Sequence, residues 1–207
     1  MNFETPYVVY VVDDDLSIRR ALQRLLRTVG LRMEGFELPA DFLAFERPDL
    51  PSCLVLDVRL PGSSGLEFQR ELSQLGIDIP VIFISGHGDI PMSVRAMKAG
   101  ACEFFSKPFR DQELLDAIQL AIAKDKEHRR IDREIDDLRQ RLAVLTARER
   151  QVFSILVTGQ LNKQIGAAIG TTESTVKAHR TQIMRKMQAN SLPELVRMAD
   201  KLQLQMA

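Results

Sequence analysis

Strand-like apolar runs alternate with helix-like segments through the first half of this chain. Residues 7–12 are β-branched or aromatic throughout, which is typical of a strand buried on both faces of a parallel sheet. Further strand-like segments at residues 31–36, 53–56, 81–84 and 103–106 are each followed by an amphipathic helical stretch. Helical connections make successive strands parallel, so the pattern predicts an α/β fold with a five-stranded, doubly wound sheet.

Polar side chains stand where these strands end. Asp13 and Asp14 follow the first run, Asp57 the third, Ser85 the fourth and Lys107 the fifth. Because the carboxyl ends of parallel strands open at one edge of a sheet, we expect these side chains to meet in one crevice. An aspartate after a strand is, by itself, most often a turn former or a helix cap. The whole set at four strand ends favours a functional site.

Chemistry narrows what such a crevice can do. Three neighbouring carboxylates repel one another unless a cation lies among them, and an all-oxygen cluster suits Mg²⁺. With the metal bound, one carboxylate can attack phosphorus, while the lysine and Mg²⁺ neutralise the oxygens of the transferring phosphoryl group. The sequence therefore predicts an aspartyl-phosphate site.

Four stretches resemble the response-regulator receiver family: residues 12–15 (VDDD), 56–62 (LDVRLPG), 84–89 (ISGHGD) and 104–109 (FFSKPF). The resemblance covers about residues 6–122 and implies a flavodoxin-like receiver domain.

The resemblance also assigns roles. It implies that Asp57 is the phosphoacceptor, and that Asp14, Asp57 and the backbone carbonyl of Arg59 ligate Mg²⁺, with Asp13 acting through water. Ser85 and Lys107 would bind the phosphoryl group. Phe104 occupies the family's aromatic switch position, whose ring turns inward when the hydroxyl group engages the phosphate. Serine at position 85 replaces the more frequent threonine but keeps the hydroxyl.

A charged middle segment without Pro or Gly, residues 118–145, predicts a long helix. Its apolar residues are spaced by four and three positions, as in a heptad repeat: Ile131, Ile135, Leu138, Leu142 and Leu145. This seam could pair with the same helix of a second subunit or pack on the chain's own domains. We expect a receiver domain at residues 1–122, a helical linker at 123–142 and a second domain at 143–207.

The last part of the chain carries helix signals and excess positive charge. Residues 146–207 hold 9 basic and 4 acidic side chains, against 12 and 18 in residues 1–118. Thr146 and Glu149 fit a capping box, Asn162 and Thr172 could cap the next two helices, and Gly170 supplies the turn between them. Two helices joined in this way predict a helix-turn-helix whose second helix enters the major groove. We expect the first of these two helices to bury Ile165, Ala168 and Ile169. The same pattern also fits a plain four-helix bundle with a solvated basic face.

Residues 145–152 (LTARERQV), 162–165 (NKQI), 173–179 (ESTVKAH) and 183–187 (IMRKM) resemble the LuxR-type helix-turn-helix domain, over about residues 143–205. Together the two resemblances indicate the NarL/FixJ family of response regulators, and residues 86–92 (GHGDIPM) are closest to the FixJ branch. By this similarity, Lys177, Ala178 and Thr181 face DNA bases. The similarity further implies phosphate or sugar neighbours at Lys163, Thr175, His179, Arg180 and Lys186.

The implied function is that of a two-component transcription regulator. A sensor histidine kinase would phosphorylate Asp57, and the phosphorylated chain would form a homodimer, bind double-stranded promoter DNA and act with RNA polymerase. The chain would be a phosphoacceptor rather than an enzyme. A phosphatase of the haloacid-dehalogenase type, with Asp13 and Asp15 as its DxD motif, is an alternative that gives Asp57 no task. A regulator whose receiver is a phosphate-independent scaffold is another.

Cellular location and the cysteines follow from simpler observations. No apolar run approaches the roughly 18 residues of a membrane helix, and the first residues lack signal-peptide features, so we expect a cytoplasmic protein without membrane contact. Cys53 and Cys102 are flanked by apolar residues and show no zinc-site spacing, so we expect two buried free thiols.

Overall fold

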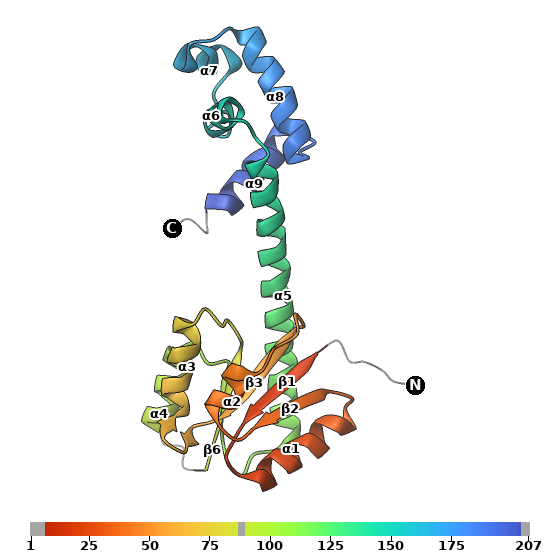
Figure 1. Ribbon diagram of the computed structural model, residues 1–207, viewed down its shortest axis with the longest axis vertical. Helices are drawn as coiled ribbons and strands as arrows, with labels where there is room; N and C mark the ends of the chain where they lie inside the picture. Colours follow the sequence, from red (N-terminus) through yellow and green to blue (C-terminus); the bar gives the residue numbers. More distant parts are fainter. Residues whose placement is uncertain (1–6, 87–89, 204–207) are drawn as a thin grey trace. The chain divides into compact units, whose positions relative to one another are not determined.

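The computed structural model describes residues 7–86 and 90–203. Contacts divide the chain into two units, Met1–Arg129 and Arg130–Ala207, which are described separately. The division falls inside the long helix α5 (Asp111–Ala143), coloured green in Figure 1.

The first unit is built on a five-stranded parallel sheet (Figure 1). Its strands are β1 (Val8–Val12), β2 (Arg32–Phe36), β3 (Ser52–Asp57), β6 (Val81–Ser85) and β7 (Glu103–Ser106), in the spatial order β2-β1-β3-β6-β7. This order reverses direction between β1 and β3, where doubly wound sheets hold their ligands. The predicted fold is thus confirmed.

Helices cover both faces of the sheet, because alternate residues of each strand point to opposite sides. On one face, Tyr10 and Leu54 pack with side chains of α2 (Pro39–Ala44), α3 (Gly65–Gln74) and α4 (Ile90–Lys98). On the other face, Val9 and Val55 pack against α1 (Leu16–Thr28) and the first part of α5.

A small hairpin follows β3. Strand β4 (Arg59–Leu60) pairs antiparallel with β5 (Ser63–Ser64). The predicted Pro61–Gly62 turn joins them, and Gly62 adopts a φ of 79°, which suits glycine at the third position of a type II turn. The hairpin leads directly into α3.

The second unit contains α6 (Ala147–Leu156), α7 (Asn162–Ile169), α8 (Glu173–Met187) and α9 (Leu192–Gln203). The end of α5 contributes buried Leu138 and partly buried Leu142 to its core, and Leu145, just beyond the helix, is buried there as well. Ile131, at the start of the heptad seam, is 39% exposed. The later residues of the seam therefore pack within the chain's own second unit.

Two details of the second unit differ from the sequence-based prediction. Helix α7 begins at Asn162 and is preceded by Leu161, whose N–H donates to Oε1 of Gln164 at 2.8 Å. A glutamine three residues beyond the cap position thus satisfies the N–H, so the prediction of Asn162 as the cap was wrong. Ala168 was expected in the core but is exposed.

The other predicted caps are confirmed. Thr146 and Glu149 form a reciprocal capping box, and the Thr172 hydroxyl accepts from the N–H of Thr175. Gly170 ends α7 in the left-handed conformation, with a φ of 67°.

Both cysteines are free thiols, but only Cys53 is buried; Cys102 lies half-exposed at the edge of β7. Within the described residues, no helix combines the length and the apolar character that crossing a bilayer requires.

Candidate functional site

The ends of β1 and β3 bring two carboxylates together. Val12 lies opposite Leu56 in the parallel register, so the strands end side by side at Asp13 and Asp57. Asp13 is fully buried and Asp57 is 7% exposed, whereas Asp14 lies at the surface. One carboxylate oxygen from each of these three residues lies within 4.8 Å of the others. The predicted acidic cluster is therefore formed.

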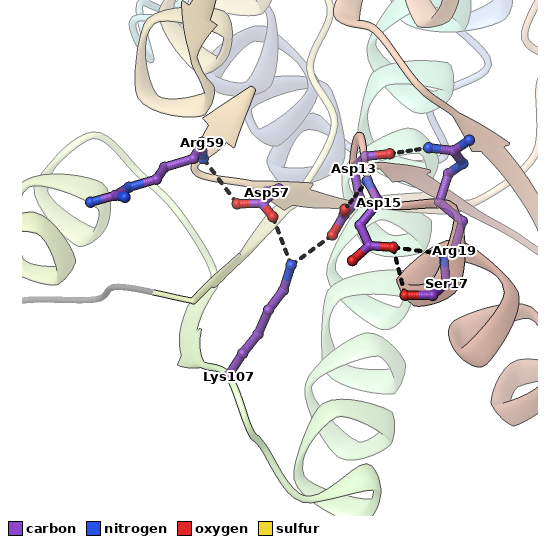
Figure 2. A network of polar contacts seen from close by, with 7 residues as sticks. All are labelled: Asp13, Asp15, Ser17, Arg19, Asp57, Arg59 and Lys107. Atoms are coloured by element: carbon purple, nitrogen blue, oxygen red, sulfur yellow. Dashed lines mark hydrogen bonds and ion pairs between the residues drawn. The ribbon is translucent and has the colours of Figure 1, made fainter. Parts of the chain in front are cut away.

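Lys107 bridges two of these carboxylates (Figure 2). Its Nζ donates to Oδ2 of Asp13 at 2.8 Å and to Oδ2 of Asp57 at 2.6 Å. The backbone N–H of Lys107 donates to the carbonyl of Ser85 at 2.7 Å, which ties the loop after β7 to the end of β6. The lysine thus reaches the strand-end crevice from β7, which lies two strands away from β3 in the sheet.

Electrostatics follow from this geometry. Burial raises the pKa of the Asp13 carboxyl above its usual range, and hydrogen bonds from Lys107 and Asp15 offset only part of that effect. For Lys107, burial alone would lower the pKa, but the hydrogen bonds and charges of Asp13 and Asp57 outweigh it and raise the pKa. Lys107 therefore remains an ammonium ion at neutral pH.

The donor set fits a divalent cation. Three carboxylates and one ammonium leave two negative charges, which a single divalent ion neutralises. The ligand atoms are all oxygens, and exposed Asp14 leaves an approach for an ion that keeps several waters, as Mg²⁺ does. The crevice could thus hold Mg²⁺ beside Asp57.

The remaining predicted residues of this site lie around the crevice. The N–H of Arg59 donates to Oδ1 of Asp57 at 2.9 Å. Ser85 is fully buried at the end of β6. Phe104 is half-buried on β7, with its ring centroid 6.4 Å from that of Phe83. Part of the predicted FixJ-like loop, residues 87–89, lies outside the described residues.

Gly65 is a site residue that sequence reasoning missed. A Cβ at this position would lie 2.3 Å from the backbone oxygen of Asp57, so only glycine allows α3 to begin so close to the strand end. The N–H of Gly65 donates to the carbonyl of Val58 at 2.9 Å. The Ser64–Glu67 capping box marks this helix start and is visible in the sequence.

Helices α7 and α8 form the second candidate site. Val176, Ile183 and Met187 are buried, so α8 turns its opposite face to solvent. Most of the predicted DNA-contact residues of α7 and α8 are exposed: Lys163, Thr175, Lys177, Ala178 and Thr181. His179 and Arg180 are half-exposed, and Arg180 lies 3.5 Å from the side-chain oxygen of Asn162.

Lys186 lies in a different setting. Its ammonium donates to Oε2 of Glu149 at 2.6 Å and lies 3.5 Å from the carbonyl oxygen of Val144. Glu149 is buried, and its side chain also accepts the N–H of Thr146. Lys186 therefore ties the end of α8 to the start of α6.

Comparison with known families accounts for both halves of the chain. The "Response regulator receiver domain" family matches residues 9–119, and "Bacterial regulatory proteins, luxR family" matches residues 143–199. Nodulation protein W of Bradyrhizobium diazoefficiens is 51% identical over 198 residues, covering 96% of this chain and 87% of that protein. The transcriptional regulatory protein FixJ of Rhizobium meliloti is 43% identical over 199 residues, covering 94% and 96%. The chain belongs to the NarL/FixJ family of response regulators.

A solved structure extends this likeness to the whole regulator. The response regulator StyR has a TM-score of 0.83 and 47% sequence identity, covering 94% of this chain and 98% of that one. The family prediction is thus confirmed, and the protein is a transcriptional response regulator rather than a metabolic enzyme. The phosphatase alternative, which leaves the LuxR-type domain unexplained, is set aside.

Proposed function

We propose that Asp57 accepts a phosphoryl group from a sensor histidine kinase with Mg²⁺, and that phosphorylation drives binding to double-stranded promoter DNA. The observation that supports this most strongly is the bridge from Lys107 to both Asp13 and Asp57, with Asp14 beside them. The Lys107 ammonium already contacts both carboxylates, so it can stay paired with the negative charge when that charge moves from Asp57 to the phosphoryl group.

In the proposed reaction, an oxygen of the Asp57 carboxylate attacks phosphorus while the bond from phosphorus to the kinase imidazole breaks. The imidazole leaves with the bonding electron pair and takes up a proton. Bound by Asp14, Asp57 and the carbonyl of Arg59, and by Asp13 through water, Mg²⁺ would neutralise charge on the equatorial oxygens. Lys107 turns from the carboxylates to a phosphoryl oxygen.

The switch follows at the far side of the crevice. The Ser85 hydroxyl donates to the attached phosphoryl group, and the Phe104 ring moves inward. Phosphorylation then biases a two-state equilibrium that already exists in the unmodified chain.

A homodimer on the surface of α4, β7 and α5 is the proposed consequence. This surface carries exposed apolar side chains, among them Ile90 (80% exposed), Met97 (45%) and Leu120 (73%). Exposed apolar side chains on these elements favour burial against a partner. Two copies of α8 would then read two half-sites about one DNA turn apart, and the bound dimer would act with RNA polymerase in the cytoplasm.

Selection of genomic DNA fragments tests this proposal. The full chain is incubated with sheared genomic DNA, with and without Mg²⁺ and beryllofluoride, which mimics the phosphoryl group. We expect a shared sequence to be enriched at least tenfold more with beryllofluoride. The enrichment should disappear in Asp57→Asn and in Lys177→Ala.

Equal enrichment under both conditions would contradict the switch and support a receiver that acts as a phosphate-independent scaffold. Binding that ignores both salt concentration and the Lys177→Ala change would contradict DNA reading by α8, because phosphate contacts make affinity salt-dependent.

A further inference from the structure

Arg19, on the second turn of α1, reaches back to the acidic turn at the end of β1. Its Nη1 donates to the backbone carbonyl oxygen of Asp13 at 2.5 Å, and its Nη2 lies 3.6 Å from Oε2 of Glu37. The side chain is only 13% exposed. Figure 2 shows Arg19 and Lys107 approaching Asp13 from opposite sides, Arg19 at the backbone and Lys107 at the carboxylate.

Asp13 is fully buried, so each of its polar groups needs a partner. Its N–H donates to the carbonyl of Phe36 at 3.2 Å, and its Oδ1 accepts the N–H of Asp15 at 2.9 Å. Lys107 donates to its Oδ2, and Arg19 donates to its carbonyl oxygen. Arg19 thus completes the set of hydrogen bonds that holds this residue.

The carbonyl of Asp13 belongs to the peptide group that leads into Asp14. Because a peptide group is planar, fixing its oxygen also fixes the N–H and the Cα position of Asp14. The Asp14 carboxylate makes no hydrogen bond or ion pair with the part of the chain that the structure describes. Its placement beside Asp57 therefore depends on the backbone that Arg19 holds.

The position of Arg19 is itself supported. Its Cδ lies beside β2, 3.7 Å from where a Cβ on Gly35 would stand. The carboxylate of Glu37 balances the guanidinium charge. Glu37 therefore partly cancels the repulsion between Arg19 and a cation in the crevice. The main effect of the Arg19 side chain on the site is then its hydrogen bond to the carbonyl of Asp13.

We propose that Arg19 is a positioning residue of the phosphoryl-transfer site: it orients the Asp13–Asp14 peptide and thereby sets the affinity of the crevice for a divalent cation. Arg19 touches neither the metal nor the phosphoryl group. The inference rests on the proposed function of Asp57. Residues that orient metal ligands commonly change metal affinity by roughly 10- to 100-fold when they are replaced.

The test compares four full-length proteins: wild type, Arg19→Ala, Arg19→Lys and the matched control Arg20→Ala. Arg20 is the exposed neighbour on the same helix. Calorimetric titration with Mg²⁺ alone should show a dissociation constant about tenfold higher in Arg19→Ala. Arg19→Lys keeps a charged donor and should fall between wild type and Arg19→Ala, while Arg20→Ala should match wild type.

A kinetic measurement separates positioning from loss of structure. The rate of phosphorylation by acetyl phosphate is followed against Mg²⁺ concentration. In Arg19→Ala the half-saturating Mg²⁺ concentration should rise by the same factor of about ten, with the rate at saturating Mg²⁺ within about threefold of wild type.

The outcomes distinguish the role of Arg19 from the proposed phosphorylation of Asp57. If wild type neither binds Mg²⁺ nor accepts the phosphoryl group, the proposed function fails. If wild type does both and Arg19→Ala behaves like it, or binds Mg²⁺ more tightly, the role of Arg19 is overturned alone. A lower saturating rate with unchanged Mg²⁺ affinity in Arg19→Lys would overturn it as well.

Discussion

Replacing Asp125 tests how α5 is joined to the sheet of the first unit. Asp125 is a carboxylate on α5 that is only 2% exposed. Its Oδ2 accepts the backbone N–H of Ser52, the first residue of β3, at 2.8 Å and Nε of Arg129 at 2.7 Å. Arg129 also reaches Asp49 at 2.5 Å. Strand β3, which ends at Asp57, is thus bound to α5 through its first residue, Ser52.

The expected cost follows from these bonds. A hydrogen bond to a charged group contributes about 1.5–3 kcal/mol, and a buried N–H left without a partner costs about 1–3 kcal/mol. These two figures overlap, since both describe the Ser52 N–H, and Arg129 keeps Asp49 and solvent as partners. We therefore expect Asp125→Ala to lower the free energy of unfolding of the first unit by about 3 kcal/mol. Asp125→Asn keeps an acceptor oxygen for Ser52 and should cost about half as much.

Scanning calorimetry of the full chain measures this change. The transition of the first unit is recognised by its upward shift with Mg²⁺ and beryllofluoride, since a ligand stabilises the unit that binds it. A loss of about 3 kcal/mol should lower that midpoint by about 10 °C. Lys126→Ala, at the exposed next position of α5, should change it by no more than about 2 °C.

Hydrogen exchange at the Ser52 amide gives a local readout. Exchange should accelerate strongly in Asp125→Ala and little in Lys126→Ala. Equal midpoints for the two variants, with Ser52 equally protected, would refute the reasoning that Asp125 binds β3 to α5.

Three further predictions concern other parts of the regulator. Gly65→Ala places a Cβ against backbone atoms of Asp57 and should slow its phosphorylation by acetyl phosphate about 100-fold, and a rate near wild type would contradict the close approach. Hydrogen bonds from Lys186 and from the Thr146 N–H lower the pKa of Glu149 from 4.5 to about 2. Ionised Glu149 therefore stabilises the folded state fully above pH 4.5, and this contribution is lost as the pH falls towards 2. Glu149→Gln should thus make the helical circular dichroism of the full chain depend less on acid pH. Lys177→Ala should reduce the slope of log affinity for DNA against log salt by about 1, whereas Lys201→Ala, on α9, should leave it unchanged.

The sequence predicts those features that depend on short-range patterns. The β-branched run before Asp13 identifies a buried strand, and parallel connection then brings Asp57 and Lys107 to the same edge. The caps at Thr146 and Thr172 are equally local, because donor and acceptor lie three residues apart.

Other features depend on how distant segments pack. Nothing near Asp125 in the sequence indicates a bond to Ser52, which lies 73 positions away. Gly65 is decisive because of the backbone of Asp57 beside it, and the Lys186 ammonium is directed to Glu149 by the packing of α8 on α6. From the sequence alone, such residues look like ordinary surface or turn residues, because their roles depend on tertiary contacts.

Mapping the phosphoryl group by mass spectrometry tests the central claim most directly. The full chain is treated with acetyl phosphate and Mg²⁺, and the acyl phosphate is located after proteolysis. We predict close to one phosphoryl group per chain, carried by Asp57, with none in Asp57→Asn or when Mg²⁺ is chelated. A label on Asp13 or Asp14 of the wild-type chain, or equal labelling of wild type and Asp57→Asn, would contradict the assignment.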